Sequence, residues 1–96
     1  MLYFKSDGRY NYYNKGYQYI AEFKWNNREE RDQYFQLCKV LTEMYGPDKQ
    51  RVYKGDTTFF KTEFNPQWLS ENKKTVKRRR IYFKEEASLS MAMLKM

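Results

Sequence analysis

NREERDQYFQLCKVLTEMYGP, residues 27–47, predicts one long amphipathic helix. Asn27 followed by Glu30 has the spacing of a capping box, and the acids nearby suit the positive end of a helix dipole. Apolar residues then recur at helical spacing and form one stripe, which comprises Tyr34, Leu37, Cys38, Leu41, Met44 and Tyr45. Gly46-Pro47 ends the pattern, so we expect a helix over residues 28–45 with its apolar stripe against a core.

Strands are predicted on the N-terminal side of this helix. Asp7-Gly8 is a two-residue hairpin signal between LYFK and RYNYY, and a second turn is expected at residues 14–16. In the segment YQYIAEFKW, residues 17–25, aromatic or apolar residues alternate with residues that are mostly polar. This alternation gathers one face of the strand, which consists of Tyr17, Tyr19, Ala21, Phe23 and Trp25. We therefore expect an N-terminal hairpin and then a strand with one buried face.

The C-terminal half is predicted to contain two long strands and a helix. RVYKGDTTFFKTEF, residues 51–64, is typical of extended chain, with a turn or bulge at Gly55-Asp56. Asn65-Pro66 interrupts it, and residues 67–72 are expected to form a loop or short turn. A basic strand over residues 73–83 follows. The last segment, residues 85–96, fits a short helix, and its simple alternation also fits a strand.

This order predicts an α+β fold with an antiparallel β-sheet and two helices on one face. The element order is β-α-β-β-α, a ferredoxin-like variant, preceded by an N-terminal β-hairpin. No linker or repeat divides the chain, so residues 1–96 are expected to form a single domain. The expected core comprises Phe23, Trp25, Leu37, Cys38, Leu41, Phe60, Phe64, Ile81 and Phe83.

The C-terminal segment is too apolar to be a free tail. Its large apolar residues are Met91, Met93, Leu94 and Met96. We expect it to pack on the sheet or on a second copy of the chain, which would give a homodimer.

The composition excludes several classes of protein. Aromatic residues make up 20% of the chain, too many for a small core to hide, so several tyrosines must face solvent or a partner. The N-terminus has no apolar leader segment, and no stretch is long enough to span a membrane. The single cysteine, Cys38, cannot form an internal disulfide. We therefore expect a cytoplasmic protein that does not enter membranes.

The residues needed for most catalysis are missing. The chain has no histidine, which removes the commonest general base and metal ligand, and a single cysteine cannot build a zinc site. The four glycines stand singly, so no phosphate-binding loop is present. Cys38 lies on the apolar stripe and is expected to be a buried, inert thiol. We expect no enzyme activity, no metal and no cofactor.

The positive charge is concentrated in KKTVKRRRIYF, residues 73–83. Residues 70–84 contain seven Lys or Arg and one Glu, a net +6 of the total +7. Alternation places Arg78, Arg80 and Tyr82 on one face and Arg79 with Ile81 on the other. A charged edge strand discourages aggregation, but four consecutive cations exceed what that role needs. Arginine is also suited to bidentate contact with phosphate.

We therefore expect a small nucleic-acid-binding domain, with RNA or single strands favoured, in which tyrosines beside basic residues stack bases. The predicted binding residues are Lys73, Lys74, Lys77, Arg78, Arg79, Arg80, Tyr82, Arg9, Lys15, Tyr12 and Tyr19. The alternative is a small protein-docking inhibitor or adaptor, such as an accessory protein of a phage or mobile element. Its Tyr-rich N-terminal surface would then bind a protein partner.

Overall fold

The computed structural model describes residues 1–10, 12–71 and 77–96, and it confirms the predicted helix. This helix, α1, spans Arg28–Tyr45, and the Asn27 side chain accepts a hydrogen bond from the Glu30 amide at 3.2 Å. Gly46 ends the helix at φ 89°, a conformation that other residues rarely adopt. The buried residues of the helix are Tyr34, Leu37, Val40 and Leu41.

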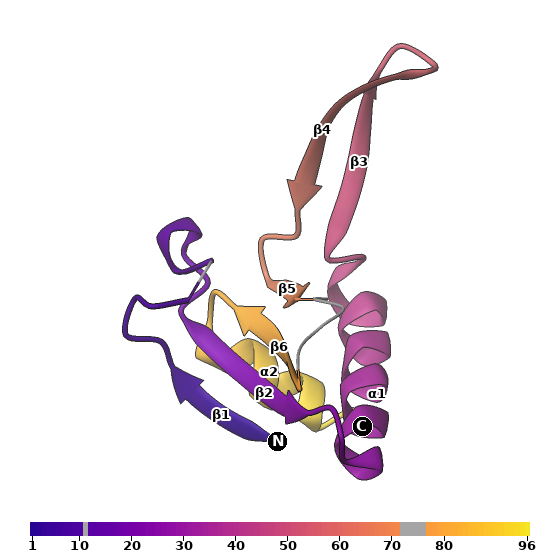
Figure 1. The fold of residues 1–96 in the computed structure, drawn as a ribbon. Helices are drawn as coiled ribbons and strands as arrows, with labels where there is room; N and C mark the ends of the chain where they lie inside the picture. The colour runs from indigo at the N-terminus through magenta and orange to yellow at the C-terminus, as the bar shows by residue number, and fades with distance from the viewer. Residues whose placement is uncertain (11, 72–76) are drawn as a thin grey trace.

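The described residues form six strands, a 3-10 turn and two α-helices. The other elements are β1 (Leu2–Lys5), η1 (Tyr13–Lys15), β2 (Tyr19–Lys24), β3 (Lys49–Lys54), β4 (Thr58–Phe64), β5 (Trp68–Glu71), β6 (Arg78–Phe83) and α2 (Glu86–Met93). Four strands make an antiparallel sheet in the order β1-β2-β6-β5, and β3 and β4 make a separate two-stranded ribbon (Figure 1). None of the described helices is long and apolar enough to cross a membrane.

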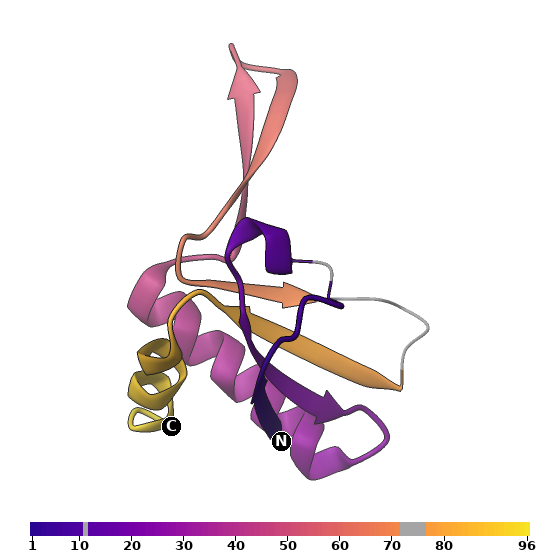
Figure 2. The same ribbon diagram turned by 90° about the vertical axis from the view of Figure 1, so that its left-hand side faces the viewer.

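The main hydrophobic core lies between the sheet and the two helices, which cover the same face of the sheet (Figure 2). Its buried residues are Ala21, Phe23, Tyr34, Leu37, Val40, Leu41, Trp68, Ile81, Phe83, Leu89 and Ala92. Most of the predicted core is therefore confirmed. Trp25 and Cys38 pack against this core at its margin and are only partly buried.

A second core covers the opposite face, which we name the outer face of the sheet. It consists of Tyr17, Ile20, Leu69 and Tyr82, with partly buried Phe4, Tyr10, Tyr12 and Phe64 around them. The prediction of one buried face for residues 17–25 is therefore wrong. Ile20 and Ala21 point to opposite faces and both are fully buried, because the segment between β1 and β2 folds back over the outer face.

The predicted two-residue hairpin at Asp7-Gly8 is also wrong. The N-terminal hairpin is formed by β1 and β2, in register from Leu2 opposite Glu22 to Lys5 opposite Tyr19. Strand β1 pairs with β2 instead of with the described residues of RYNYY, and the rings of Tyr10 and Tyr12 pack over the outer face. The predicted turn at residues 14–16 is confirmed, since Gly16 follows η1 at φ 92°.

Two corrections concern the neighbourhood of the basic segment. Residues 67–72 were predicted as a loop, but Trp68–Glu71 forms strand β5 and buries Trp68 and Leu69 in different cores. The described part of the basic strand, β6, is paired with β2 on one side and β5 on the other. Over residues 80–83 it is therefore not an edge strand, so edge protection does not explain Arg80, whereas Arg78 and Arg79 lie beyond the described pairs with β5. Residues 73–76 lie outside the described part of the chain.

The fold is α+β with antiparallel sheets and two helices, as predicted, but the ferredoxin-like β-α-β-β-α order is not found. The observed order is β1-β2-α1-β3-β4-β5-β6-α2. The difference arises because residues 49–64 pair with each other and leave the sheet, while β5 takes the place beside β6. Phe60, predicted to be in the core, therefore lies on the ribbon and is 59% exposed.

The helical interpretation of the C-terminal segment is confirmed for Glu86–Met93. Leu89 and Ala92 are buried in the main core, where α2 meets α1 and β6. The large apolar residues Met91, Met93, Leu94 and Met96 are exposed. The helix therefore packs on the sheet through Leu89 and Ala92. A homodimer through the exposed residues stays a prediction.

Substitution of one core residue, Leu41, and one ribbon residue, Phe60, tests the division between core and ribbon. We expect Leu41→Ala to lower the free energy of unfolding by roughly 2–5 kcal/mol, because Leu41 is fully buried. Phe60→Ala should change it by less than about 0.5 kcal/mol, since its ring is exposed. Denaturant unfolding of both variants measures the difference, and a large loss for Phe60→Ala would contradict its place on the ribbon.

Candidate nucleic-acid interface

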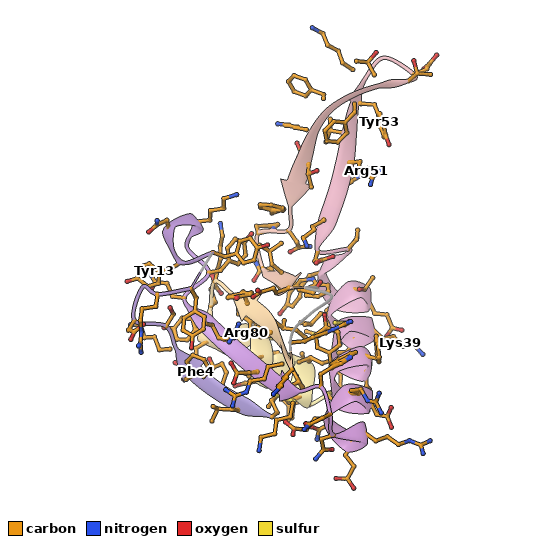
Figure 3. The ribbon with its side chains drawn as sticks, viewed as in Figure 1. Phe4, Tyr13, Lys39, Arg51, Tyr53 and Arg80 are labelled. Atoms are coloured by element: carbon orange, nitrogen blue, oxygen red, sulfur yellow. The ribbon has the colours of Figure 1, made fainter. Side chains whose placement is uncertain are left out.

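Strand β6 carries three consecutive arginines into the middle of the sheet. In its register with β2, Arg78 lies opposite Lys24 and Arg80 lies opposite Glu22. Because successive side chains of a strand point to opposite faces, Arg78 and Arg80 emerge on the outer face and Arg79 on the helix face. Figure 3 shows Arg80 over the sheet, whereas Lys39 extends from the far side of α1.

A cavity of about 370 Å³ opens on the outer face between the N-terminal segment and β6. Its lining residues are Leu2, Phe4, Lys5, Asp7, Arg9, Tyr10, Glu22, Arg78 and Arg80. The lining contains four cations and two carboxylates, so positive charge is in excess by two. Three predicted binding residues, Arg9, Arg78 and Arg80, are therefore brought together from distant parts of the sequence.

A second cavity, of about 340 Å³, adjoins the first. The two share Leu2, Glu22 and Arg78, and the second adds Lys24, which is exposed. The second cavity also contains the chain's N-terminal amine, which forms a 2.8 Å ion pair with Glu30. Together the two cavities make a depression along the outer face of β1, β2 and β6.

Glu22 contacts two of the three arginines of the depression. Its carboxylate is 7% exposed and accepts hydrogen bonds from Arg80 Nε at 2.8 Å and from Arg78 Nη1 at 3.3 Å. The Arg80 side chain is 23% exposed, and its guanidinium also lies 3.9 Å from Glu71 and 5.1 Å from the centre of the Tyr10 ring. The Arg78 side chain is 57% exposed. Arg78 therefore keeps donors available to a ligand.

Tyr82 lies beneath these arginines and does not reach the surface. It is 1% exposed and donates a hydrogen bond to the Glu71 carboxylate. Burial raises the pKa of the Tyr82 phenol, and the Glu71 carboxylate raises it further, so the hydroxyl keeps its proton. Tyr82 was predicted to contact nucleic acid. Its buried ring instead belongs to the second core, and its hydroxyl positions Glu71 beside Arg80.

Of the other predicted residues of the basic segment, those that the structure describes do not line the depression. Arg79 is half-buried on the helix face, where its guanidinium lies 3.7 Å from the centre of the Trp25 ring. Lys77 is exposed, and its carbonyl accepts a hydrogen bond from the Trp25 amide at 2.8 Å. Lys73 and Lys74 lie outside the described residues. Arg79 thus has an internal partner, whereas the Lys77 side chain has no described contact.

The predicted stacking tyrosines are occupied by contacts within the protein. The Tyr12 ring makes edge contacts with Tyr17, Phe64 and Tyr82 at centroid distances of 6.5, 6.1 and 5.0 Å. Tyr19 stacks on Tyr3 at 6.5 Å. Both tyrosines are partly buried. Their contacts fill the two faces of the sheet, so these two rings are not presented flat to a ligand.

Lys15 is away from the depression, at the base of the ribbon. Its ammonium lies 4.4 Å from the centre of the Phe64 ring, and the side chain is exposed. Glu22 and Lys24 are among the residues of the depression that were not predicted to bind a ligand. The only signal was their position on the polar side of an alternating strand, which by itself indicates a solvent-facing residue.

The described residues contain no group of three or more His, Cys, Asp or Glu side chains that could hold a metal ion. No protein-family model matches the chain, and no curated protein or solved structure is significantly similar to it. The depression, in which Glu22 contacts Arg78 and Arg80, is therefore the candidate binding site of the described residues.

Replacing Glu22 tests whether it holds the arginines. We expect Glu22→Gln to lower the free energy of unfolding by roughly 1–3 kcal/mol, because Arg80 would keep its charge in a largely buried place with a weaker partner. Asp7→Asn is the matched control. It removes an ion pair with Arg9 in which both side chains are mostly exposed, so thermal unfolding should barely change. Equal effects of the two substitutions would contradict the role of Glu22.

Cys38 lies outside the depression, at the margin of the main core, and its reactivity tests a separate prediction. Burial raises the pKa of its thiol to about 12, so almost none is thiolate near neutral pH. We expect alkylation of the folded protein at pH 8 to be at least tenfold slower than alkylation in denaturant. Fast labelling of the native chain would show that Cys38 is an accessible nucleophile and not the inert thiol that the sequence predicts.

Proposed function

We propose that this chain binds single-stranded nucleic acid, RNA or DNA, along the outer face of the sheet. The observation that carries the proposal is the convergence of Arg9, Lys24, Arg78 and Arg80 on one depression. Phosphate contacts by Lys and Arg supply most of the affinity in sequence-independent binding. The proposal is one of binding, and it includes no catalytic step.

The contact with Glu22 supports phosphate binding by the arginines. A guanidinium has five N–H donors, and Glu22 uses only one on each arginine. Arg78 is 57% exposed, and its hydrogen bond to Glu22 leaves its other donors available to a phosphate. The excess of two positive charges in the first cavity also attracts a polyanion.

A small protein-docking inhibitor or adaptor is the second candidate function. The observation that favours it is the set of exposed apolar side chains away from the depression, which includes Tyr53, Phe59 and Phe60 on the ribbon. The Tyr-rich N-terminal segment gives it less support than the sequence suggested. Tyr12 and Tyr17 turn their rings inward, to the second core.

The salt dependence of binding tests the proposed function. If Arg9, Lys24, Arg78 and Arg80 contact phosphates, log K should fall against log salt with a slope of about −3 on a labelled single strand of about 20 nucleotides. The triple variant Arg9→Gln/Lys24→Gln/Arg78→Gln should reduce this slope to about −1, because about −0.7 is lost with each phosphate contact. Arg79 and Arg80 are left unchanged because they contact Trp25 and Glu22.

A control variant with the same loss of charge separates local contacts from net charge. Arg31→Gln/Lys39→Gln/Lys95→Gln removes three exposed cations, two on α1 and one just after α2, and we expect it to keep most of the slope. Fluorescence anisotropy at several salt concentrations measures both variants. Wild-type binding weaker than about 100 μM, or equal loss in both triple variants, would overturn the proposal.

A further inference from the structure

The β3-β4 ribbon stands away from both cores. Figures 1 and 2 show it rising from the sheet and helices as a free two-stranded hairpin. Its base is fixed to the end of α1, since the Asn65 side chain donates to the carbonyls of Tyr45 at 2.8 Å and Pro47 at 3.1 Å. Beyond that base, every residue of β3 and β4 except Val52 and Phe64 is exposed. A two-stranded ribbon is only marginally stable alone in water, and contact with a ligand would stabilise it.

Three aromatic rings are exposed on the ribbon. Tyr53, Phe59 and Phe60 are 48%, 56% and 59% exposed, and the Tyr53 and Phe59 rings lie 6.2 Å apart at their centroids. The register shifts between Val52 and Tyr53, so Phe60 is an extra residue with no partner across the ribbon. Bulges of this kind re-aim a side chain. The ribbon therefore presents large flat surfaces to solvent.

Positive charge is interleaved with these rings. The charged residues of the two strands are Lys49, Arg51, Lys54, Lys61 and Glu63. The Lys61 ammonium lies 5.8 Å from the centre of the Phe60 ring and 3.3 Å from Glu63. The side chains of Arg51 and Lys54 make no hydrogen bond or ion pair with the described residues. Figure 3 shows Arg51 and Tyr53 on the same strand of the ribbon, clear of the body of the protein.

We infer that the ribbon is a base-stacking platform for a single-stranded nucleic acid, with Tyr53, Phe59 and Phe60 stacking the bases. This inference rests on the proposed function, whose phosphate contacts lie on the outer face. Exposed aromatic rings beside Lys and Arg are the means by which proteins bind unpaired bases without regard to sequence. A duplex fits less well, because its base faces are available only after costly unstacking.

The charge of the ribbon favours a nucleic acid over a protein partner. Protein interfaces are depleted in lysine, particularly at their centres, where the aromatic residues gather. On this ribbon, Lys54 is adjacent in sequence to Tyr53, and Lys61 is adjacent to Phe60. An apolar protein groove closing on the rings would have to desolvate these ammonium groups, whereas a nucleic acid supplies a phosphate for each.

A basic surface joins the ribbon to the outer face. Phe64, at the end of β4, contacts the Tyr12 ring and lies under the Lys15 ammonium. Lys84 lies close to the same loop, with its ammonium 5.0 Å from the centre of the Tyr17 ring. A strand bound at Arg51 can thus continue past Lys15 toward the depression and meet cations along its course. This course gives Lys15 the phosphate-binding role that the sequence predicted.

Removal of single rings tests the inference in the full-length chain. We compare Tyr53→Ile, Phe59→Ile and Phe60→Ile, because isoleucine preserves strand propensity and apolar character but has no flat face. The ligand is a labelled single strand of about 20 thymidines, with a matched strand that lacks the bases. Each substitution should weaken binding to the thymidine strand by roughly 5- to 100-fold and leave binding to the abasic strand unchanged.

Phe35→Ile is the matched control, since Phe35 is exposed to the same 56% as Phe59 but lies on α1. It should not alter binding to either strand. Equal weakening on the abasic and thymidine strands would overturn the inference, because the rings would then act without bases. Thymidine binding that persists in all three ring variants but is lost in the Arg9/Lys24/Arg78 variant would overturn the inference alone. Failure of the wild type to bind either strand would overturn the proposed function as well.

Discussion

The antiparallel pairing of β2 with β6 supports both cores and the candidate interface. Its register sets Ala21 beside Ile81 on the helix face and Ile20 beside Tyr82 on the outer face, so one pairing provides a surface for each core. The same register sets Glu22 opposite Arg80. Because the side chains of a strand alternate, a slip of one residue would move arginines into the main core, where an unpaired charge is costly.

The parts of the fold that could be predicted have local signals. The cap at Asn27, the apolar stripe and the stop at Gly46 all lie within one segment, and they give the bounds of α1 without reference to the rest of the chain. The errors come from contacts between distant segments. Nothing local shows that Tyr10 and Tyr12 cover the outer face, and nothing local at Phe60 shows that it lies outside the core. The stability of those arrangements depends on partners that the pattern does not contain.

The candidate site was predictable to a similar extent. The run of positive charge in residues 77–80 indicated a binding role for the arginines, and strand alternation predicted that Arg78 and Arg80 share a face. Glu22 could not be recognised, because one carboxylate on an alternating strand looks like a solvent-facing residue until the register brings it to Arg80. The sequence predicts binding roles for Tyr12 and Tyr82 because a tyrosine-rich pattern does not distinguish a ring that packs in a core from one that faces solvent.

The separateness of the ribbon also means that stability is unevenly distributed along the chain. Strands β3 and β4 are paired only with each other, so their amides are expected to exchange with solvent through local opening rather than through global unfolding. The hydrogen bonds of Asn65 to Tyr45 and Pro47 mark where such opening stops. The chain therefore combines a cooperative body with an arm whose order can be gained or lost at little cost to that body.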